Sequence, residues 1–255
     1  MVLERKDFFK KNMNTLFGTK MGMTQTFIEG FRIPVTKINL GPCTVVQIKN
    51  QEKDGYWSVQ LGFGEKKLKN TTKPLQGHFK KANITPRYIK EIRLDKEPEY
   101  KVGDVIKAGD VVKSGDVVFV TANTKGKGFA GGVRRFNFRG GPKTHGQSDR
   151  HRAPGSIGQT TTPGRVYRGK RMAGRMGNTQ VTVKNLHVIN VDQEKNEVLV
   201  SGALPGRIGS FLVLKKVKSG SLKDLEHEVV AQVVEVEEAP TVDEKKEGAV
   251  NENQS

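Results

Sequence analysis

The chain has 255 residues, 35% of them hydrophobic, and carries 44 Lys or Arg against 27 Asp or Glu, a formal net charge of +17. No run approaches the ~18 consecutive apolar residues of a membrane-spanning helix, so we expect a soluble, cytoplasmic protein that binds no membrane. The single cysteine, Cys43, excludes an intramolecular disulfide and a thiolate metal cluster. The positive charge indicates an acidic partner.

Strand-like sequences recur before and after the centre of the chain. They are short, rich in β-branched residues and separated by turn signals such as Gly41-Pro42 and Asp54-Gly55. Alternating apolar residues bury one face of a strand, so these runs predict a mainly β fold, a β-barrel or sandwich, with little helix. The predicted strands cover residues 33–40, 43–50, 57–63, 116–123, 180–192, 197–204 and 210–217.

Three further features lie between or within these runs. Residues 73–94 show weak helical spacing that is interrupted at Pro86, which predicts an excursion from the sheet. Between Lys101 and Val118 the triplet Gly-Asp-Val recurs every six residues; three copies are too few for a β-helix, so we expect tight turns between short strands. Asn196 separates two strand-like runs and predicts a hairpin over residues 180–204.

Residues 124–180 differ from the rest of the chain. They hold thirteen Lys or Arg against one acid, Asp149, and their apolar residues are too sparse to define a helix or strand face. Ordering a backbone costs about 1–2 kcal/mol per residue, which this segment cannot offset by burying a core of its own. We therefore expect it to fold against a polyanion.

The composition of this segment favours RNA. Glycines let a backbone approach phosphates, Lys and Arg contact phosphates, and Phe129, Phe136, Phe138 and Tyr167 can stack on unpaired bases. The sequence contains no helix-turn-helix, zinc-finger or basic-zipper pattern that would read DNA. The residues predicted to bind RNA are Lys125, Lys127, Arg134, Arg135, Arg139, Lys143, His145, Arg150, His151, Arg152, Arg165, Arg168, Lys170, Arg171 and Arg175.

Two spacings typical of nucleotide sites occur in the same segment. Residues 126–131 fit GxGxxG, but a dinucleotide site needs a helix there, and the following GGVRRFNFRGGP is not expected to form a stable one. Residues 164–170 fit GxxxxGK, but Arg171 stands where a P-loop needs Ser or Thr to hold magnesium. The sequence therefore predicts no nucleotide cofactor and no small-molecule substrate.

No metal site or catalytic group is predicted either. His145, Asp149 and His151 lie close together, but the neighbouring Arg150 and Arg152 would repel a divalent cation, and no further zinc ligand follows at a suitable spacing. Neither a serine nor a cysteine nucleophile has a recognisable setting. We expect the histidines to donate to phosphates or to stack on bases.

Several segments together carry a family pattern. They are LFGTKMGMTQTF (16–27), IPVTKINLGPCTVVQIK (33–49), KPLQGHFKKA (73–82), TKGKGFAGGVRRFNFRG (124–140), THGQSDRHRAPGSIGQTTTPGRVYRGKRMAGRMGN (144–178) and LVSGALPGRIGSFLVLK (199–215). Between Leu16 and Lys218 the chain resembles the family of bacterial large-subunit ribosomal protein three. The stretch from Lys125 to Asn178 is the most specific part of the resemblance.

The resemblance implies a closed β-barrel of the translation-protein type, formed by residues 14–123 and 180–218, with residues 124–179 as an inserted rRNA-binding extension loop. It implies a structural protein that binds large-subunit rRNA directly, helps nucleate subunit assembly and extends the loop toward the peptidyl transferase centre. It also implies ribosomal proteins fourteen and nineteen as neighbours. By position, Gln159 matches a glutamine that is N5-methylated in some family members.

The two ends of the chain have no counterpart in the family pattern. Residues 1–13 form an N-terminal extension that could adopt a short basic amphipathic helix. Residues 219–255 are acidic, and we expect a disordered, solvated tail beyond Pro240.

Three hypotheses follow. The first is a structural RNA-binding protein of the large ribosomal subunit, located in the cytoplasm and without catalytic residues. The second is a free RNA chaperone or assembly factor, which stable co-sedimentation with mature subunits through high-salt washing would exclude. The third is an enzyme whose glycine-rich loop holds nucleotide phosphates, which a failure to bind nucleotides at millimolar concentration would exclude.

Overall fold

The computed structural model describes residues 13–28 and 30–221, which form two compact units. Of the described residues, the first unit contains 13–28, 30–122, Thr182–Leu204 and 208–221, and the second contains Asn123–Val181 with Pro205–Arg207. The expectations for residues 1–12 and for the acidic tail from residue 222 lie outside the described residues. Each unit is treated separately below.

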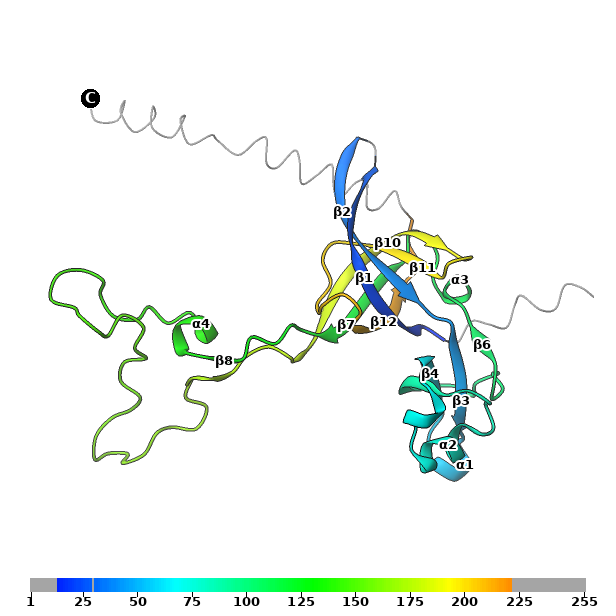
Figure 1. The fold of residues 1–255 in the computed structure, drawn as a ribbon, viewed down its shortest axis with the longest axis horizontal. Coiled ribbons are helices and arrows are strands. Elements are labelled where there is room, and N and C mark those ends of the chain that lie inside the picture. The colour runs from blue at the N-terminus through cyan, green and yellow to red at the C-terminus, as the bar shows by residue number, and fades with distance from the viewer. Residues whose placement is uncertain (1–12, 29, 222–255) are drawn as a thin grey trace, which may run out of the picture. The chain divides into compact units, whose positions relative to one another are not determined.

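The first unit is built on a closed ring of six hydrogen-bonded strands (Figure 1). The register pairs Gly18 with Leu40 on one side and with Leu212 on the other, so one strand is hydrogen-bonded along both edges. Closing the ring removes the free edges over the paired part of each strand, whereas β1 beyond Lys20 pairs with β2 alone. In ring order the strands are β1 (Thr15–Ile28), β12 (Phe211–Lys218), β7 (Val117–Asn123), β10 (Gln180–Asp192), β11 (Glu197–Ser201) and β2 (Phe31–Leu40).

A second, four-stranded sheet belongs to the same unit. Its order is β5 (Pro86–Arg93), β4 (Ser58–Glu65), β3 (Cys43–Lys49) and β6 (Val105–Ile106). Four short helical segments accompany it: α1 (Gln51–Asp54), the 3-10 turn η1 (Leu68–Asn70), α2 (Lys73–Phe79) and α3 (Ala108–Val111). The described structure is therefore mainly β, as the sequence predicts.

One core joins the ring and the second sheet. Strand residues alternate between buried and partly exposed, as in β7, where Val118 and Val120 are fully buried and their neighbours are not. Leu61 of β4 and Leu214 of β12 belong to the same buried cluster. Burying each Val or Leu side chain contributes about 1.5–3 kcal/mol, so this shared core holds the two sheets together.

The Gly-Asp-Val repeat forms one kind of turn three times. In each copy an aspartate carboxylate accepts a hydrogen bond from the backbone N–H three residues earlier, at 2.8 Å for Asp104, 3.0 Å for Asp110 and 2.7 Å for Asp116. Asp side chains that bond locally to the backbone favour turns over regular structure. The repeat thus marks tight turns around short elements, as predicted, and not a solenoid.

Two sequence expectations in this unit need correction. The helical reading of residues 73–94 holds only for α2, because the chain turns after Phe79 and Pro86 opens strand β5. Proline fits the first residue of a strand, where its missing N–H removes no essential ladder bond. Strand β1 was absent from the predicted set, although at 14 residues it is the longest strand described.

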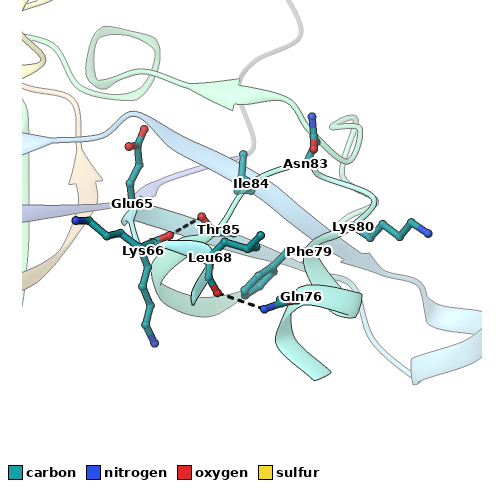
Figure 2. Close-up of a pocket in the computed structure, with 10 residues that line it drawn as sticks. Glu65, Lys66, Leu68, Gln76, Phe79, Lys80, Asn83, Ile84 and Thr85 are labelled. Carbon is teal, nitrogen blue, oxygen red and sulfur yellow. Dashed lines mark hydrogen bonds between the residues drawn. The ribbon is translucent and has the colours of Figure 1, made fainter. Parts of the chain in front are cut away.

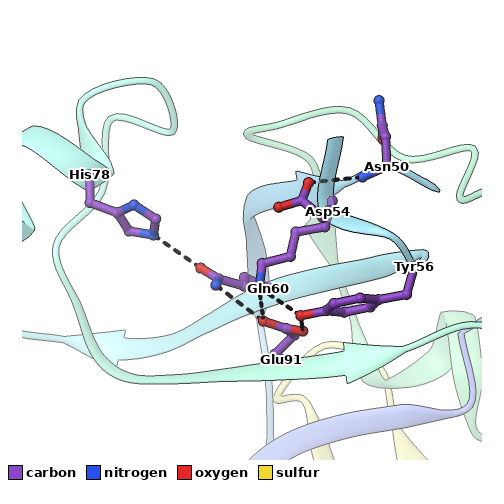
Figure 3. Close-up of polar contacts among 7 residues, drawn as sticks. Asn50, Asp54, Tyr56, Gln60, His78 and Glu91 are labelled. Carbon is purple, nitrogen blue, oxygen red and sulfur yellow. Dashed lines mark hydrogen bonds and ion pairs between the residues drawn. The ribbon is translucent and has the colours of Figure 1, made fainter. Parts of the chain in front are cut away.

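A polar network ties α2 and the loop after α1 to the second sheet (Figure 3). The Lys49 ammonium donates to a carboxylate oxygen of Glu91 and to the Tyr56 hydroxyl, each at 2.8 Å, and Tyr56 donates to the other Glu91 oxygen at 2.7 Å. His78 of α2 donates through Nε2 to the side-chain carbonyl of Gln60 at 3.0 Å. His78 is therefore an exposed residue with a structural contact.

The second unit has little regular structure. Its elements are β8 (Phe129–Ala130), α4 (Gly132–Phe136) and β9 (Gly174–Arg175), and β8 pairs with β9. The stretch GGVRRFNFRGGP, which is not expected to form a stable helix, forms only the five-residue α4, and Asn137 ends it in the left-handed conformation. Among the described helices, none is long and apolar enough to span a membrane.

Candidate nucleic-acid interface

The two chain ends of the second unit run side by side. The Thr124 N–H donates to the Thr179 carbonyl, Lys127 N–H to the Met176 carbonyl and Met176 N–H to the Gly128 carbonyl, each at 2.9 Å. Gly177 has a φ of 75°, and a Cβ at this position would meet the Lys125 carbonyl oxygen. A glycine is therefore required where the two backbones approach.

Beyond this stem, a cluster around Phe136 fixes two of the predicted RNA-binding arginines. Arg135 lies over the Phe136 ring, 4.9 Å from its centroid, and donates through Nη1 to the Met172 carbonyl at 2.8 Å. Arg171 lies over the same ring at 5.6 Å, and the Phe138 ring is 6.0 Å away. Phe136 is thus engaged within the unit, and the two guanidinium groups are held by cation–π contacts.

A second close approach brings residues 140–142 against residues 150–151. The Gly141 N–H donates to the His151 carbonyl at 3.0 Å, and His151 Nδ1 donates to the Pro142 carbonyl at 3.0 Å. A Cβ on Gly141 would meet the Arg150 carbonyl oxygen. This packing places the predicted residues Arg150, His151 and Arg152 next to the glycine pair.

These segments enclose a hollow of about 560 Å³. Arg139, Arg150, Lys170 and Arg171 line it, together with the apolar side chain of Ile157. Four cations around one concave surface suit an anionic ligand with several phosphates. The hollow therefore brings together predicted RNA-binding residues from separate parts of the segment, such as Arg139 and Arg171.

The tip of the segment is exposed and held by local bonds. Ser156 donates through its hydroxyl to the Gly158 carbonyl at 2.9 Å, and the Gly164 N–H donates to Thr160 at 3.3 Å. Gln159 lies between these bonds and is exposed. Its carboxamide is therefore accessible from solvent.

Most of the predicted RNA-binding side chains are exposed and keep their charges available. Only Arg135 and His151 are half-buried. Within the described residues of this segment no ion pair joins any of these cations to a carboxylate. The exposed set comprises Lys125, Lys127, Arg134, Arg139, Lys143, His145, Arg150, Arg152, Arg165, Arg168, Lys170, Arg171 and Arg175.

Exposed aromatic side chains accompany these cations. Phe129 is 79% exposed and Tyr167 55% exposed, so each presents a ring face to solvent. Base–aromatic stacking contributes about 1–3 kcal/mol per base, and it tolerates any sequence. The sequence grouped four aromatic residues as stacking candidates, and the structure leaves these two free for the role.

The geometry offers little for catalysis. Among the described residues no three His, Cys, Asp or Glu side chains gather as a metal site. Cys43 is fully buried, and burial raises the pKa of its thiol to about 12, so it is no activated nucleophile. The GxGxxG spacing precedes only the five-residue α4, and β8 pairs antiparallel with β9, so the parallel βαβ unit of a dinucleotide site is not formed by these elements.

Comparison with known proteins decides the family. The sequence profile described as ribosomal protein L3 matches residues 93–204. The chain is 50% identical over 212 residues to the large ribosomal subunit protein uL3 of Herpetosiphon aurantiacus, covering 83% of this chain and 100% of that protein. The chain belongs to the ribosomal protein L3 family.

Two other L3 relatives agree. The uL3 protein of Picosynechococcus sp. is 54% identical over 200 residues, covering 77% of this chain and 93% of the relative. That of Thermomicrobium roseum is 54% identical over 201 residues, covering 78% and 92%. The predicted resemblance is confirmed, and the L3 family is a structural component of the ribosome and not an enzyme, which removes the nucleotide-enzyme hypothesis.

Proposed function

We propose that this L3-family chain is a structural constituent of the large ribosomal subunit in the cytoplasm, and that residues 124–179 bind large-subunit rRNA directly. One observation carries the proposal. The second unit exposes a dense set of Lys and Arg side chains that have no carboxylate partners within its described residues. Such unpaired like charges repel one another, and a phosphate backbone relieves that repulsion.

The first unit acts as the anchor in this proposal, with its ring as a closed β-barrel of the translation-protein type. The closed strand order and the shared core support a body whose shape does not change when RNA binds. The second unit then acts as an extension loop that completes its packing on rRNA. Short local bonds such as that between Ser156 and Gly158 give it a preferred form before binding.

Further elements of the proposal rest on family membership. The chain helps nucleate subunit assembly, its tip at residues 155–163 extends toward the peptidyl transferase centre, and ribosomal proteins fourteen and nineteen are its neighbours. The exposure of Gln159 at that tip supports this residue as the site of N5-methylation before assembly. Mass measurement of the peptide that contains Gln159 tests the modification, with an added methyl group expected.

Salt-dependent binding to large-subunit rRNA tests the main proposal. Arg134, Arg150, Arg152 and Arg168 are exposed and hold no internal contact around Phe136, so replacing all four by Gln removes charge without loosening that cluster. Each lost phosphate contact lowers the slope of log affinity against log salt by about 0.7–0.9, so the slope should fall by about 3. An unchanged slope would contradict direct binding through this segment.

A matched control variant has the same net charge as the four-arginine variant. The variant with Lys101, Lys113, Lys195 and Lys218 replaced by Gln also loses four charges, all of them from exposed side chains of the first unit. It should bind rRNA with the slope of the unaltered chain. A free RNA chaperone is separated by washing: the proposed constituent stays with mature large subunits at high salt, whereas a chaperone dissociates.

A further inference from the structure

A second basic surface belongs to the first unit and shares no residue with the RNA-binding set assigned above. Between residues 66 and 90 the chain carries eight Lys or Arg and no Asp or Glu. This acid-free stretch forms η1, α2 and the first part of β5. The eight cations are Lys66, Lys67, Lys69, Lys73, Lys80, Lys81, Arg87 and Lys90.

The stretch surrounds a hollow of about 620 Å³, which we call the lysine hollow (Figure 2). Lys66, Lys67 and Lys80 line it beside the apolar side chains of Leu68 and Phe79. Figure 2 shows Leu68 and Phe79 next to each other, with Lys80 extending away from them. Leu68 is 60% exposed, so part of the apolar wall faces solvent. The hollow thus combines an apolar wall with a cationic rim.

Hydrogen bonds hold the hollow in shape. The Gln76 carboxamide donates to the Leu68 carbonyl at 3.3 Å and to the Thr71 carbonyl at 2.8 Å, and the Thr85 hydroxyl donates to the Lys66 carbonyl at 2.7 Å. A ligand that enters a site with this geometry pays little for ordering the backbone.

Helix α2 is anchored from both sides. The Phe79 side chain is 2% exposed, and His78 donates to Gln60 on strand β4. Lys80 and Lys81 directly follow these anchors and are exposed. Their ammonium groups therefore project from a fixed part of the surface, unlike lysines on a free loop.

The charges of this surface are not neutralised within the described residues. Among the described residues no ion pair involves a cation of residues 66–90, and Glu65 is the single acid that lines the hollow. A cationic rim selects a polyanion, and the exposed apolar surface of Leu68 beside it can pack against an unpaired base, so one RNA strand uses both features of the hollow. The observations favour RNA over an acidic protein segment.

We propose that the lysine hollow is a second RNA-binding site, in which lysines contact successive phosphates and an unpaired nucleotide packs against Leu68. The inference rests on the proposed function, because it assumes that the chain works on RNA. It adds a contact made by the first unit, independent of residues 124–179. RNA is then held at two separate surfaces of one chain.

Charge removal in the full chain gives the first test. The variant with Lys67, Lys69, Lys80 and Lys81 replaced by Gln changes only exposed side chains, so folding is preserved. We expect its affinity for large-subunit rRNA at about 0.1 M salt to fall tenfold or more, and its log–log salt slope to fall by about 3. The control variant of Lys101, Lys113, Lys195 and Lys218 should keep the full slope; equal behaviour of the two variants overturns the proposal.

Site-directed crosslinking identifies the occupant. Leu68→Cys introduces an exposed thiol, and a benzophenone maleimide will react there because Cys43 is fully buried. We expect light to join residue 68 to the rRNA, and Val105→Cys, also exposed on the first unit, to give no RNA adduct. An adduct of residue 68 with residues 222–255 of the same chain, and none with RNA, shows an acidic segment in the hollow and overturns the proposal.

The two proposals fail in different ways. If the lysine variant binds normally while the Arg134, Arg150, Arg152 and Arg168 variant loses its salt slope, the lysine hollow is not an RNA site and the proposed function stands. If both variants bind as the unaltered chain does, the proposed function itself is wrong.

Discussion

The Lys49 ammonium lies 2.8 Å from the Glu91 carboxylate, and the two side chains meet across the intervening strand β4. The hydrogen bonds from Lys49 and Tyr56 lower the pKa of Glu91 to about 2, and the bond to Glu91 raises the pKa of Lys49. A glutamate in an unfolded chain titrates near ~4.3. The network therefore links β3 and β5, the two strands that flank β4, and its Lys49–Glu91 ion pair exists only while Glu91 is ionised.

This depressed pKa predicts how stability changes with pH. Between about pH 4.3 and pH 2 the unfolded chain binds a proton that the folded chain does not, so the contribution of Glu91 is complete above pH 4.3 and disappears toward pH 2. Glu91→Gln should lower the melting temperature at pH 6, and the two melting curves should converge near pH 2. Circular dichroism over this pH range measures the difference.

A matched control for that titration is Glu52→Gln, because Glu52 is exposed on α1 and takes part in no ion pair among the described residues. Its melting curve should follow the unaltered chain at every pH. If the difference in melting temperature between Glu91→Gln and the unaltered chain stays constant down to pH 2, the carboxylate charge is not the source of the stabilisation.

The buried pair of Asp116 and Lys216 predicts a second stability effect. Asp116 is 2% exposed, and its carboxylate accepts the Lys216 ammonium at 2.7 Å and the Lys113 N–H at 2.7 Å. Lys216→Gln leaves a buried carboxylate without its cation, and we expect the free energy of unfolding to fall by about 1–3 kcal/mol. Lys215→Gln, which changes the exposed neighbouring residue of β12, should change the free energy of unfolding little. If urea titrations give equal losses of unfolding free energy for both variants, the buried carboxylate is not the cause.

Two glycines of β1 predict opposite outcomes. A Cβ on Gly18 would meet the Asn39 carbonyl oxygen and lie 3.2 Å from the Leu40 Cα, and neither backbone atom can move without opening the ring. Gly18→Ala should therefore cost about 1–3 kcal/mol of unfolding free energy. A Cβ on Gly22 would meet nothing within 4 Å, so Gly22→Ala should not destabilise the protein. If chemical denaturation gives the same midpoint for both variants, the close approach at Gly18 leaves room for a Cβ and the predicted loss of stability is wrong.

The close approach of Gly141 to Arg150 predicts an effect on RNA binding alone. A Cβ on Gly141 would meet the Arg150 carbonyl oxygen, so Gly141→Ala must displace residues that line the basic hollow of the second unit. We expect several-fold weaker rRNA binding and unchanged cooperative melting. Gly126→Ala, whose nearest contact would be 3.9 Å away, serves as the control and should bind normally. Equal binding by both variants would contradict a preformed hollow.

The paired ends of the second unit allow a clean deletion. The Thr124 N–H donates to the Thr179 carbonyl at 2.9 Å, so an Asn-Gly turn can replace residues 125–178 without stretching the chain. Because the core cluster of the first unit contains no residue of this segment, the shortened protein should still melt cooperatively. A broad, non-cooperative transition in thermal circular dichroism would show that the first unit needs the segment.

Local pattern predicted much of the regular structure. Each of the seven predicted strand runs overlaps an observed strand, because alternation of Val, Ile and Leu with polar residues buries one face in any sheet. The largest mismatch is the run 197–204, of which β11 covers only Glu197–Ser201. Asn196 adopts φ 52° between β10 and β11, as the hairpin prediction requires. Strand β1 was missed because Gly18 and Gly22 interrupt its alternation, and only pairing with β2 and β12 makes it a strand.

The predicted site shows the same division. Charge and glycine content pointed to residues 124–180, because these properties depend on composition and need no contacts. The cluster of Arg135 and Arg171 on Phe136, and the lysine hollow between η1 and α2, have no sequence motif. Arg171 lies far from Phe136 in the sequence, and the hollow is completed only where residues 83–85 return to η1 and α2.

The sequence by itself determined the family, the strand-rich character and the basic segment, since each follows from residues that act locally or by their sum. Tertiary structure decided the closure of the ring, in which β1 pairs with β12 and β2 with β11. It also decided which cations keep free charges. Both depend on contacts between residues far apart in the chain, where hydrogen-bond register and burial select the partner and no local pattern can.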